Sequence, residues 1–184
     1  MKKKSFVMVL ALVLVFAVAV GGVVAWLTDT TGPVKNTFTV GDINIELKET
    51  GAVDGEKSYK MIPGNTLSKD PTVTVVGGSE ACWLFVKVVK STTLDSYISY
   101  TMNKTGWTAL DGQPGVYYRE VAASADNQEF SIIDDNKVTV KDTVTKTMME
   151  DLNKEGAVQP TLTFTAYAVQ KDNIADAATA WGKI

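Results

Sequence analysis

Residues 80–90 form the most apolar stretch of the chain after residue 25, and they read Glu80-Ala81-Cys82-Trp83-Leu84-Phe85-Val86-Lys87-Val88-Val89-Lys90. In an extended strand, successive side chains point to opposite faces. Apolar residues then occupy both faces: Cys82, Leu84, Val86 and Val88 on one, and Trp83, Phe85 and Val89 on the other. A strand of this kind is buried on both sides. We therefore expect residues 80–90 to lie at the centre of the core.

Short alternating runs rich in β-branched and aromatic residues flank this segment on both sides, and they predict further strands. The expected strands cover residues 38–40, 43–47, 72–76, 97–102, 107–110, 116–121, 129–133, 138–140 and 161–170. Asp111-Gly112 and Pro114-Gly115 predict a hairpin between two of them. We also expect a helix over 142–154 that begins at Asp142, and a short C-terminal helix capped by Asp172 or Asn173. The pattern favours an all-β fold, two packed antiparallel sheets with one or two short helical excursions.

The first 25 residues have the features of an export signal. Lys2, Lys3 and Lys4 precede an unbroken apolar run over 6–20, and Gly21-Gly22 and a small residue, Ala25, follow. We expect cleavage between Ala25 and Trp26, which leaves residues 26–184 as one domain outside the cell. The alternative is a retained anchor, because residues 6–27 carry no charge and could span a bilayer of about 30 Å.

Composition excludes several classes of function. The chain carries a net charge of −3, which becomes −6 when residues 1–25, with three lysines and no acid, are removed. An acidic surface with a single arginine, Arg119, argues against nucleic acid or anionic lipid as a partner. The chain has no histidine, the commonest general base and zinc ligand. It also has no nucleophile elbow and no phosphate loop. We predict a protein that is not an enzyme, with no metal, no cofactor and no small-molecule substrate, although a pair of carboxylates acting on glycosides stays open.

Two local features have both a structural and a functional interpretation. Cys82 is the only cysteine, so no disulfide can form within the chain. Its apolar neighbours predict a buried thiol, and whether it always stays reduced is open. Asp134-Asp135-Asn136 is a carboxylate cluster of the kind that binds calcium, but it lacks EF-hand spacing. We interpret it as a solvated hairpin tip, with calcium binding left open.

The segment that follows the cleavage site is unusual. It would begin with the bulky pair Trp26-Leu27 and continue as Thr28-Asp29-Thr30-Thr31. Exposed apolar residues at a free terminus are unfavourable unless they dock on a surface. The segment either folds back as an edge strand of its own sheet or adds a strand to a neighbouring molecule, which would build a fibre.

Several blocks of the sequence resemble the TasA/camelysin family, exported proteins of Firmicutes that are cut by the SipW-type signal peptidase. The most specific block runs from Gly21 to Thr30, and Lys35 to Gly41 follows it. Later blocks lie at 69–75, 78–88, 166–170 and 180–181. The resemblance implies a jelly-roll β-sandwich whose N-terminal extension, residues 26–35, contains a donor strand at Trp26, Leu27, Thr28, Asp29, Thr30 and Thr31. The metallopeptidase activity attached to camelysin does not carry over, because the chain has no His-Glu-x-x-His motif.

The leading hypothesis is a secreted structural subunit of extracellular biofilm matrix fibres, assembling by N-terminal donor-strand exchange. Its partners would be further copies of itself or a paralogous subunit, and the signal peptidase during export. The alternatives are a cell-surface peptidase of the camelysin type, and a monomeric adhesin or accessory protein that modulates the fibres of a paralogue.

Overall fold

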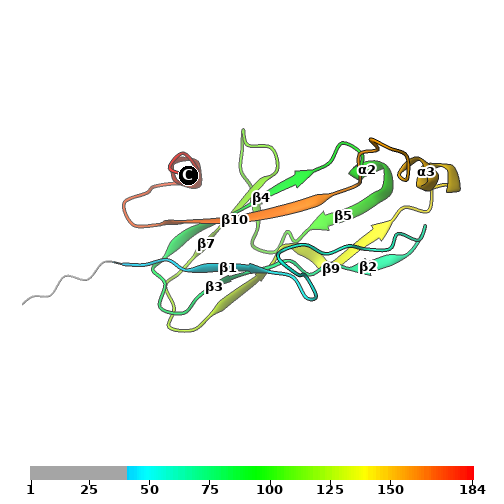
Figure 1. The fold of residues 1–184 in the computed structure, drawn as a ribbon. Helices are drawn as coiled ribbons and strands as arrows, with labels where there is room; N and C mark the ends of the chain where they lie inside the picture. Colours follow the sequence, from blue (N-terminus) through cyan, green and yellow to red (C-terminus); the bar gives the residue numbers. More distant parts are fainter. Residues whose placement is uncertain (1–40) are drawn as a thin grey trace, which may run out of the picture. The chain divides into compact units, whose positions relative to one another are not determined.

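Strand β4 (Cys82–Lys90) lies at the middle of the structure, as residues 80–90 predict. The computed structural model of the protein describes residues 41–184. Figure 1 shows the arrangement of their ten strands and three short helices. The other elements are β1 (Ile45–Lys48), β2 (Thr66–Ser68), β3 (Thr72–Val75), α2 (Leu94–Tyr97), β5 (Ile98–Met102), β6 (Thr108–Ala109), β7 (Val116–Val121), β8 (Gln128–Ser131), β9 (Ile133–Val140), α3 (Lys146–Asp151), β10 (Leu162–Gln170) and α4 (Ala177–Trp181). The expected domain boundary at residues 25 and 26 lies outside the described residues.

One layer of the fold is built around β4. All nine of its residues pair antiparallel with β10, from Cys82 opposite Gln170 to Lys90 opposite Leu162. Its first six residues also pair antiparallel with β7, and β6 adds a short strand beyond β7 to give the order β10-β4-β7-β6. The predicted hairpin at residues 111–115 is confirmed, because it joins β6 to β7.

The second layer consists of two three-stranded sheets, β1-β3-β8 and β2-β9-β5. Backbone hydrogen bonds continue between them: the Lys69 N–H donates to the Asn136 carbonyl at 2.8 Å, and the Ile132 N–H donates to the Pro71 carbonyl at 3.0 Å. Strands β2 and β3 therefore follow one another along β9 and β8, with a break in register between the two pairs. Asp135 and Asn136 adopt positive φ values of 51° and 54° at this break, which a short polar side chain tolerates.

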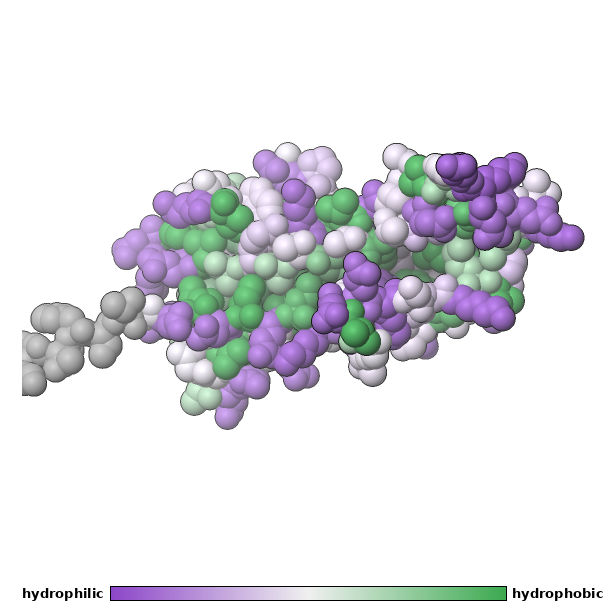
Figure 2. Space-filling view, in the orientation of Figure 1, coloured by the Kyte–Doolittle hydropathy of each residue, from purple (hydrophilic) through white to green (hydrophobic). Residues whose placement is uncertain are grey.

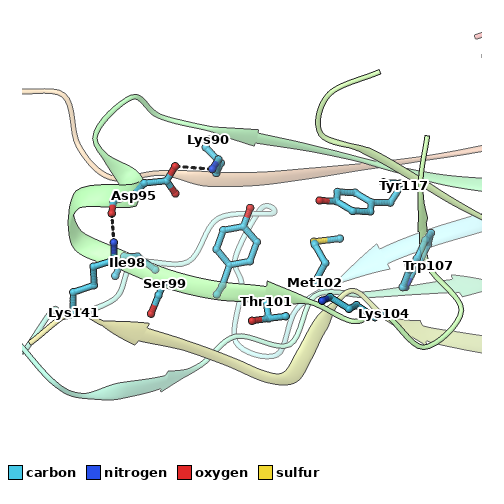
Figure 3. Close-up of a pocket in the computed structure, with 12 residues that line it drawn as sticks. Lys90, Asp95, Ile98, Ser99, Thr101, Met102, Lys104, Trp107, Tyr117 and Lys141 are labelled. Carbon is cyan, nitrogen blue, oxygen red and sulfur yellow. Dashed lines mark hydrogen bonds and ion pairs between the residues drawn. The ribbon is translucent and has the colours of Figure 1, made fainter. Parts of the chain in front are cut away.

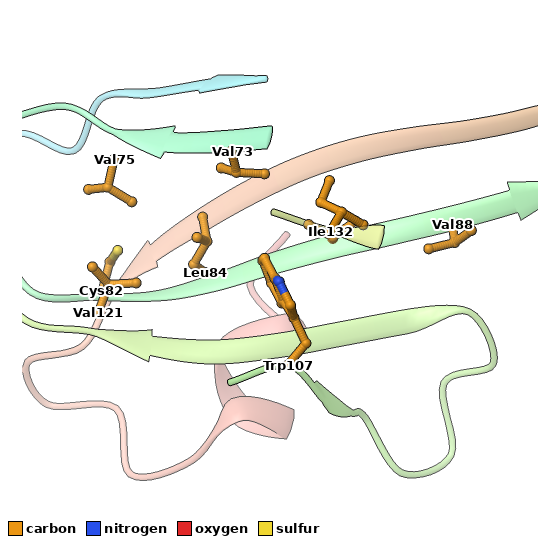
Figure 4. Packing of buried hydrophobic residues seen from close by; sticks show 9 residues of the cluster. Val73, Val75, Cys82, Leu84, Val88, Trp107, Val121 and Ile132 are labelled. Atoms are coloured by element: carbon orange, nitrogen blue, oxygen red, sulfur yellow. The ribbon is translucent and has the colours of Figure 1, made fainter. Parts of the chain in front are cut away.

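The two layers pack face to face through one apolar cluster. Figure 4 shows Val73 and Val75 of β3 facing Cys82 and Leu84 of β4. The remaining buried members are Val86, Val88, Trp107, Val121 and Ile132. A second cluster, built from β5, β9 and the residues around α2, continues the interior toward the other end. The predicted all-β antiparallel sandwich is confirmed.

The outer face of β4 is also buried, because the C-terminal segment covers it. Phe85 is fully buried, and its ring centroid lies 5.3 Å from that of Trp181 in α4. The indole N–H of Trp83 donates to the Ile174 carbonyl at 3.3 Å. Burial of β4 on both faces, predicted from the alternation of its side chains, therefore depends on the last ten or so residues of the chain.

Some local details differ from the sequence expectations. Helix α3 begins after Thr145, not at Asp142, because the Thr145 side chain accepts the Met148 N–H at 3.2 Å. Helix α4 is capped by Asp176, which accepts the Thr179 N–H at 2.7 Å. Both caps are ordinary N-cap residues, and several candidates near each helix made the choice ambiguous. The sequence does not predict strand β2 or helix α2, because three or four residues are too few to show a period.

The interpretation of Asp134 and Asp135 as a hairpin tip is wrong. Both residues belong to β9, and β8 and β9 run on with only Ile132 between them. They lie at the break in register of the second layer, where the backbone bulges and then continues in the same direction. The alternation on either side correctly predicts two strands, but it does not show whether the polar residues between them form a turn or a bulge.

We expect two glycines of the β6–β7 hairpin to respond differently to alanine. Gly112 and Gly115 have φ values of 70° and 79°, and only at Gly115 would a Cβ meet another residue, lying 2.7 Å from the Val88 carbonyl oxygen. Gly112→Ala should lower the free energy of unfolding by about 1 kcal/mol, the cost of a left-handed backbone. Gly115→Ala should lower it by about 1–3 kcal/mol more, because the added methyl must displace the backbone of β4. Urea denaturation measures both, and equal losses would contradict the close approach.

Candidate functional site

The N-terminal residues singled out by the sequence lie outside the described residues. These are the cleavage site at Ala25 and Trp26 and the donor segment Trp26–Thr31. Both stay predictions. The described residues instead provide the surfaces to which such a segment could add, which are the free edges of the two layers.

Strand β10 is a long free edge. It pairs with β4 on one side, and no strand within residues 41–184 pairs with the other. Its sequence, Leu162 to Gln170, contains no charged residue, no proline and no glycine. Natural edge strands are protected from pairing with other chains by charges, prolines, bulges or short length. Strand β10 has none of these features over nine residues, so it is a template for a further strand.

The side chains along this edge are only partly buried. Leu162, Phe164, Ala166 and Ala168 point toward the inter-layer cluster but keep exposed surface. Strand β1, the edge of the other layer, contacts β10 here. Figure 2 shows a strip of hydrophobic residues over β10 and β1. We call this strip, formed by Leu162, Phe164, Ala166 and Ala168 of β10 and the adjacent β1, the apolar seam. A strand laid along it would cover apolar surface and pair its backbone with that of β10 at the same time.

One end of the apolar seam is fixed by an ionic cluster. The Lys69 ammonium lies 2.8 Å from the Glu49 carboxylate, and the two side chains are only 11% and 13% exposed. The Tyr59 hydroxyl donates to the same carboxylate, and burial, followed by this hydrogen bond, raises the pKa of Tyr59. Lys69 also lies over the Phe164 ring of β10, 5.7 Å from its centroid. The cluster therefore joins the loop after β1 to β10, and its geometry indicates a structural role.

Cys82 is buried, as its neighbours predict, and it contacts the inter-layer cluster. Burial raises the pKa of its thiol to about 11. We expect the native protein to react with a thiol reagent at pH 8 at a rate more than about 100-fold below that of the unfolded chain, because the thiolate is both scarce and inaccessible. The absorbance of the thiolate that leaves the reagent, followed with and without denaturant, gives the ratio of the two reaction rates. Equal rates would contradict burial of the thiol.

Neither a metal site nor a membrane span is seen in the described part of the chain. Residues 41–184 bring no three Asp, Glu or Cys side chains together in a group that could hold a metal ion. No helix of this range combines the length and the apolar character that a bilayer span requires.

Sequence reasoning missed the free edge of β10 as a functional feature, although the absence of charge in residues 162–170 was visible. Which strand lies at an edge depends on pairing between distant segments, and that pairing has no local signal. Searches against protein-family models, curated proteins and solved structures give no match for this chain.

Proposed function

We propose that the protein is a secreted structural subunit of an extracellular matrix fibre. In this proposal, cleavage after Ala25 frees a segment at Trp26–Thr31, which adds as a strand to the β10 edge of the next subunit. The observation that carries the proposal is the free edge of β10, nine residues long and without a charge. The resemblance of the first block to the TasA/camelysin family supports it.

The chemistry of the two surfaces is complementary. The segment Trp26-Leu27-Thr28-Asp29-Thr30-Thr31 has two bulky apolar residues followed by residues with high strand propensity. On the acceptor, Ala166 and Ala168 are small and partly exposed, so a strand beside them can place large side chains over the apolar seam. Main-chain hydrogen bonds supply affinity in such strand addition, and alternate side chains supply specificity.

A contact of this kind joins two different surfaces of the same molecule. Such head-to-tail contacts build open filaments unless the rotation between subunits closes a ring. The export signal then has a second role, because the segment is free to pair only after cleavage outside the cell. A paralogous subunit with the same edge could substitute for the second copy.

The test uses purified protein that begins at Trp26. We expect it to form filaments visible by electron microscopy and sedimentable by centrifugation. Deletion of residues 26–31 should abolish filaments and leave a folded monomer. Ala166→Lys should do the same from the acceptor side, because an inward-pointing charge at an edge prevents pairing.

Mixing experiments separate the two surfaces. Small amounts of either variant should shorten wild-type filaments, because the deletion variant accepts but does not donate, and the Ala166→Lys variant donates but does not accept. Exposed Thr92→Lys, in the turn before α2, is the matched control and should assemble normally. Filaments of normal length from the deletion variant would refute the proposal. Filaments that form only when a paralogue is added would assign the protein an accessory role.

A further inference from the structure

A groove opens at the edge of the sandwich opposite the apolar seam. Strand β5 ends one layer at this edge and β6 ends the other. The groove has a volume of about 610 Å³, within the range of ligand sites. Figure 3 shows it between β5 and the strands of the other layer. Its lining includes Lys90, Lys104, Lys141, Tyr100, Tyr117 and Trp107.

The groove is basic in a domain that is acidic. Residues 41–184 contain 14 Lys or Arg and 20 Asp or Glu, a net charge of −6. The groove lining contains three lysines and one acid, Asp95, so its local charge is +2. A concave surface with the opposite sign to the rest of the protein concentrates ligands of negative charge.

Two of the three lysines have no carboxylate partner within residues 41–184. Lys90 holds the Asp95 carboxylate at 2.7 Å. Lys141 donates to the main-chain carbonyl of Asp95, and neither Lys141 nor Lys104 forms an ion pair within residues 41–184. Figure 3 shows Lys141 near one end of the groove and Lys104 near the other. A ligand that neutralises both must carry negative charges spaced along its length.

The wall between the lysines is aromatic and has free hydroxyl groups. Tyr100 and Tyr117 are partly exposed, and neither hydroxyl has a hydrogen-bond partner among the described side chains and backbone. Trp107 is buried in the apolar cluster against which Tyr100 and Tyr117 also pack, and its indole N–H donates to the Ser131 carbonyl at 2.9 Å. Tyrosine presents an apolar ring and a polar tip, which suits a ligand with an apolar face and hydroxyl groups.

We propose that this groove binds an acidic polysaccharide, a pyranose chain that carries carboxylates. The pyranose faces stack on Tyr100 and Tyr117, and the carboxylates pair with Lys104 and Lys141. A neutral glucan would form no ion pairs with the lysines. A polyphosphate chain, which has no sugar rings, would not stack on the tyrosines. The groove is distinct from the apolar seam, so this inference does not depend on fibre assembly.

The test is binding of the purified protein to polygalacturonate, measured by affinity electrophoresis and titration calorimetry. We expect binding that weakens as salt is raised through the physiological range, because exposed charges are screened over about 8 Å at 0.15 M. Lys104→Gln/Lys141→Gln should weaken it by about tenfold or more, the loss of two partly exposed ion pairs. Tyr117→Leu should weaken it with all charges retained.

The controls test a variant altered outside the groove and three other classes of ligand. Lys48→Gln/Lys146→Gln removes the same charge from exposed positions outside the groove and should leave binding unchanged. Dextran tests a neutral sugar, polyglutamate an acidic peptide, and a peptide of residues 26–35 a strand that pairs with β5. Polyglutamate that binds as tightly as polygalacturonate, displacement of polygalacturonate by the peptide, or equal loss in the control variant would each overturn the proposal.

Discussion

Phe85→Ala should lower the free energy of unfolding by about 3–5 kcal/mol, the usual cost of removing a buried aromatic ring. Phe85 is fully buried on the outer face of β4, where it contacts Trp181 and Tyr118. The ring packs between the sheet and α4, in the cluster that holds Ala177, Ala180 and Trp181 of the helix against the outer face of β4. We expect the near-ultraviolet circular dichroism of the tryptophans to change as well, because Trp181 loses the aromatic ring whose centroid lies 5.3 Å from its own. Urea denaturation measures the free energy.

The matched control is Val89→Ala on the same strand. Val89 is 50% exposed, so its truncation should cost less than about 1 kcal/mol. A loss of that size for Phe85→Ala as well would mean that the C-terminal segment does not cover β4. This outcome would contradict the assignment of β4 as a strand buried on both faces.

Glu49→Gln should lower the free energy of unfolding by about 3 kcal/mol, the lower end of the range for a buried ion pair that loses one partner. The substitution keeps the shape of the side chain but leaves the Lys69 ammonium, 11% exposed, without its carboxylate. The Tyr59 hydroxyl also loses an ionised acceptor. We expect the loop between β1 and β2 to become sensitive to proteolysis, because this cluster joins it to β10.

A second substitution tests whether the unpaired charge is the cause. Glu49→Gln/Lys69→Met removes both charges and should recover part of the lost stability, because an apolar side chain of similar length can pack against Phe164. Glu46→Gln is the matched control, since Glu46 pairs with Lys48 at the surface, and it should cost less than about 1 kcal/mol. No recovery in the double variant would show that the loss comes from the hydrogen bonds to Glu49.

The strands that were predicted well are those with a strong alternation of their own. Strand β4 and strand β10 have nine residues each, so the period of two is repeated several times and the boundaries differ by only one or two residues. The shortest elements, β2 and α2, gave no such signal. The sequence predicts a turn at Asp134 and Asp135, whereas both belong to β9. Whether the chain reverses at such polar residues depends on the strand that pairs with them.

The candidate sites also differ in whether they can be recognised from the sequence alone. The apolar segment at Trp26–Thr31 and the absence of histidine are properties of the sequence, and the hypothesis of a structural function was formed from them without coordinates. The apolar seam and the basic groove are not visible in it. Lys104 and Lys141 are 37 positions apart, and only the pairing of β5 with β9 and the packing of the layers bring them to one groove.

The burial of residues 80–90 on both faces can be predicted from the sequence, because alternation of apolar side chains is a property of neighbouring residues. What covers these faces depends on the tertiary structure: β3 and β8 lie on one side and the C-terminal helix α4 on the other. The tertiary structure also leaves β10, next to β4, with a free edge. Pairing between distant strands is set by the packing of the whole core, and no single segment carries that information.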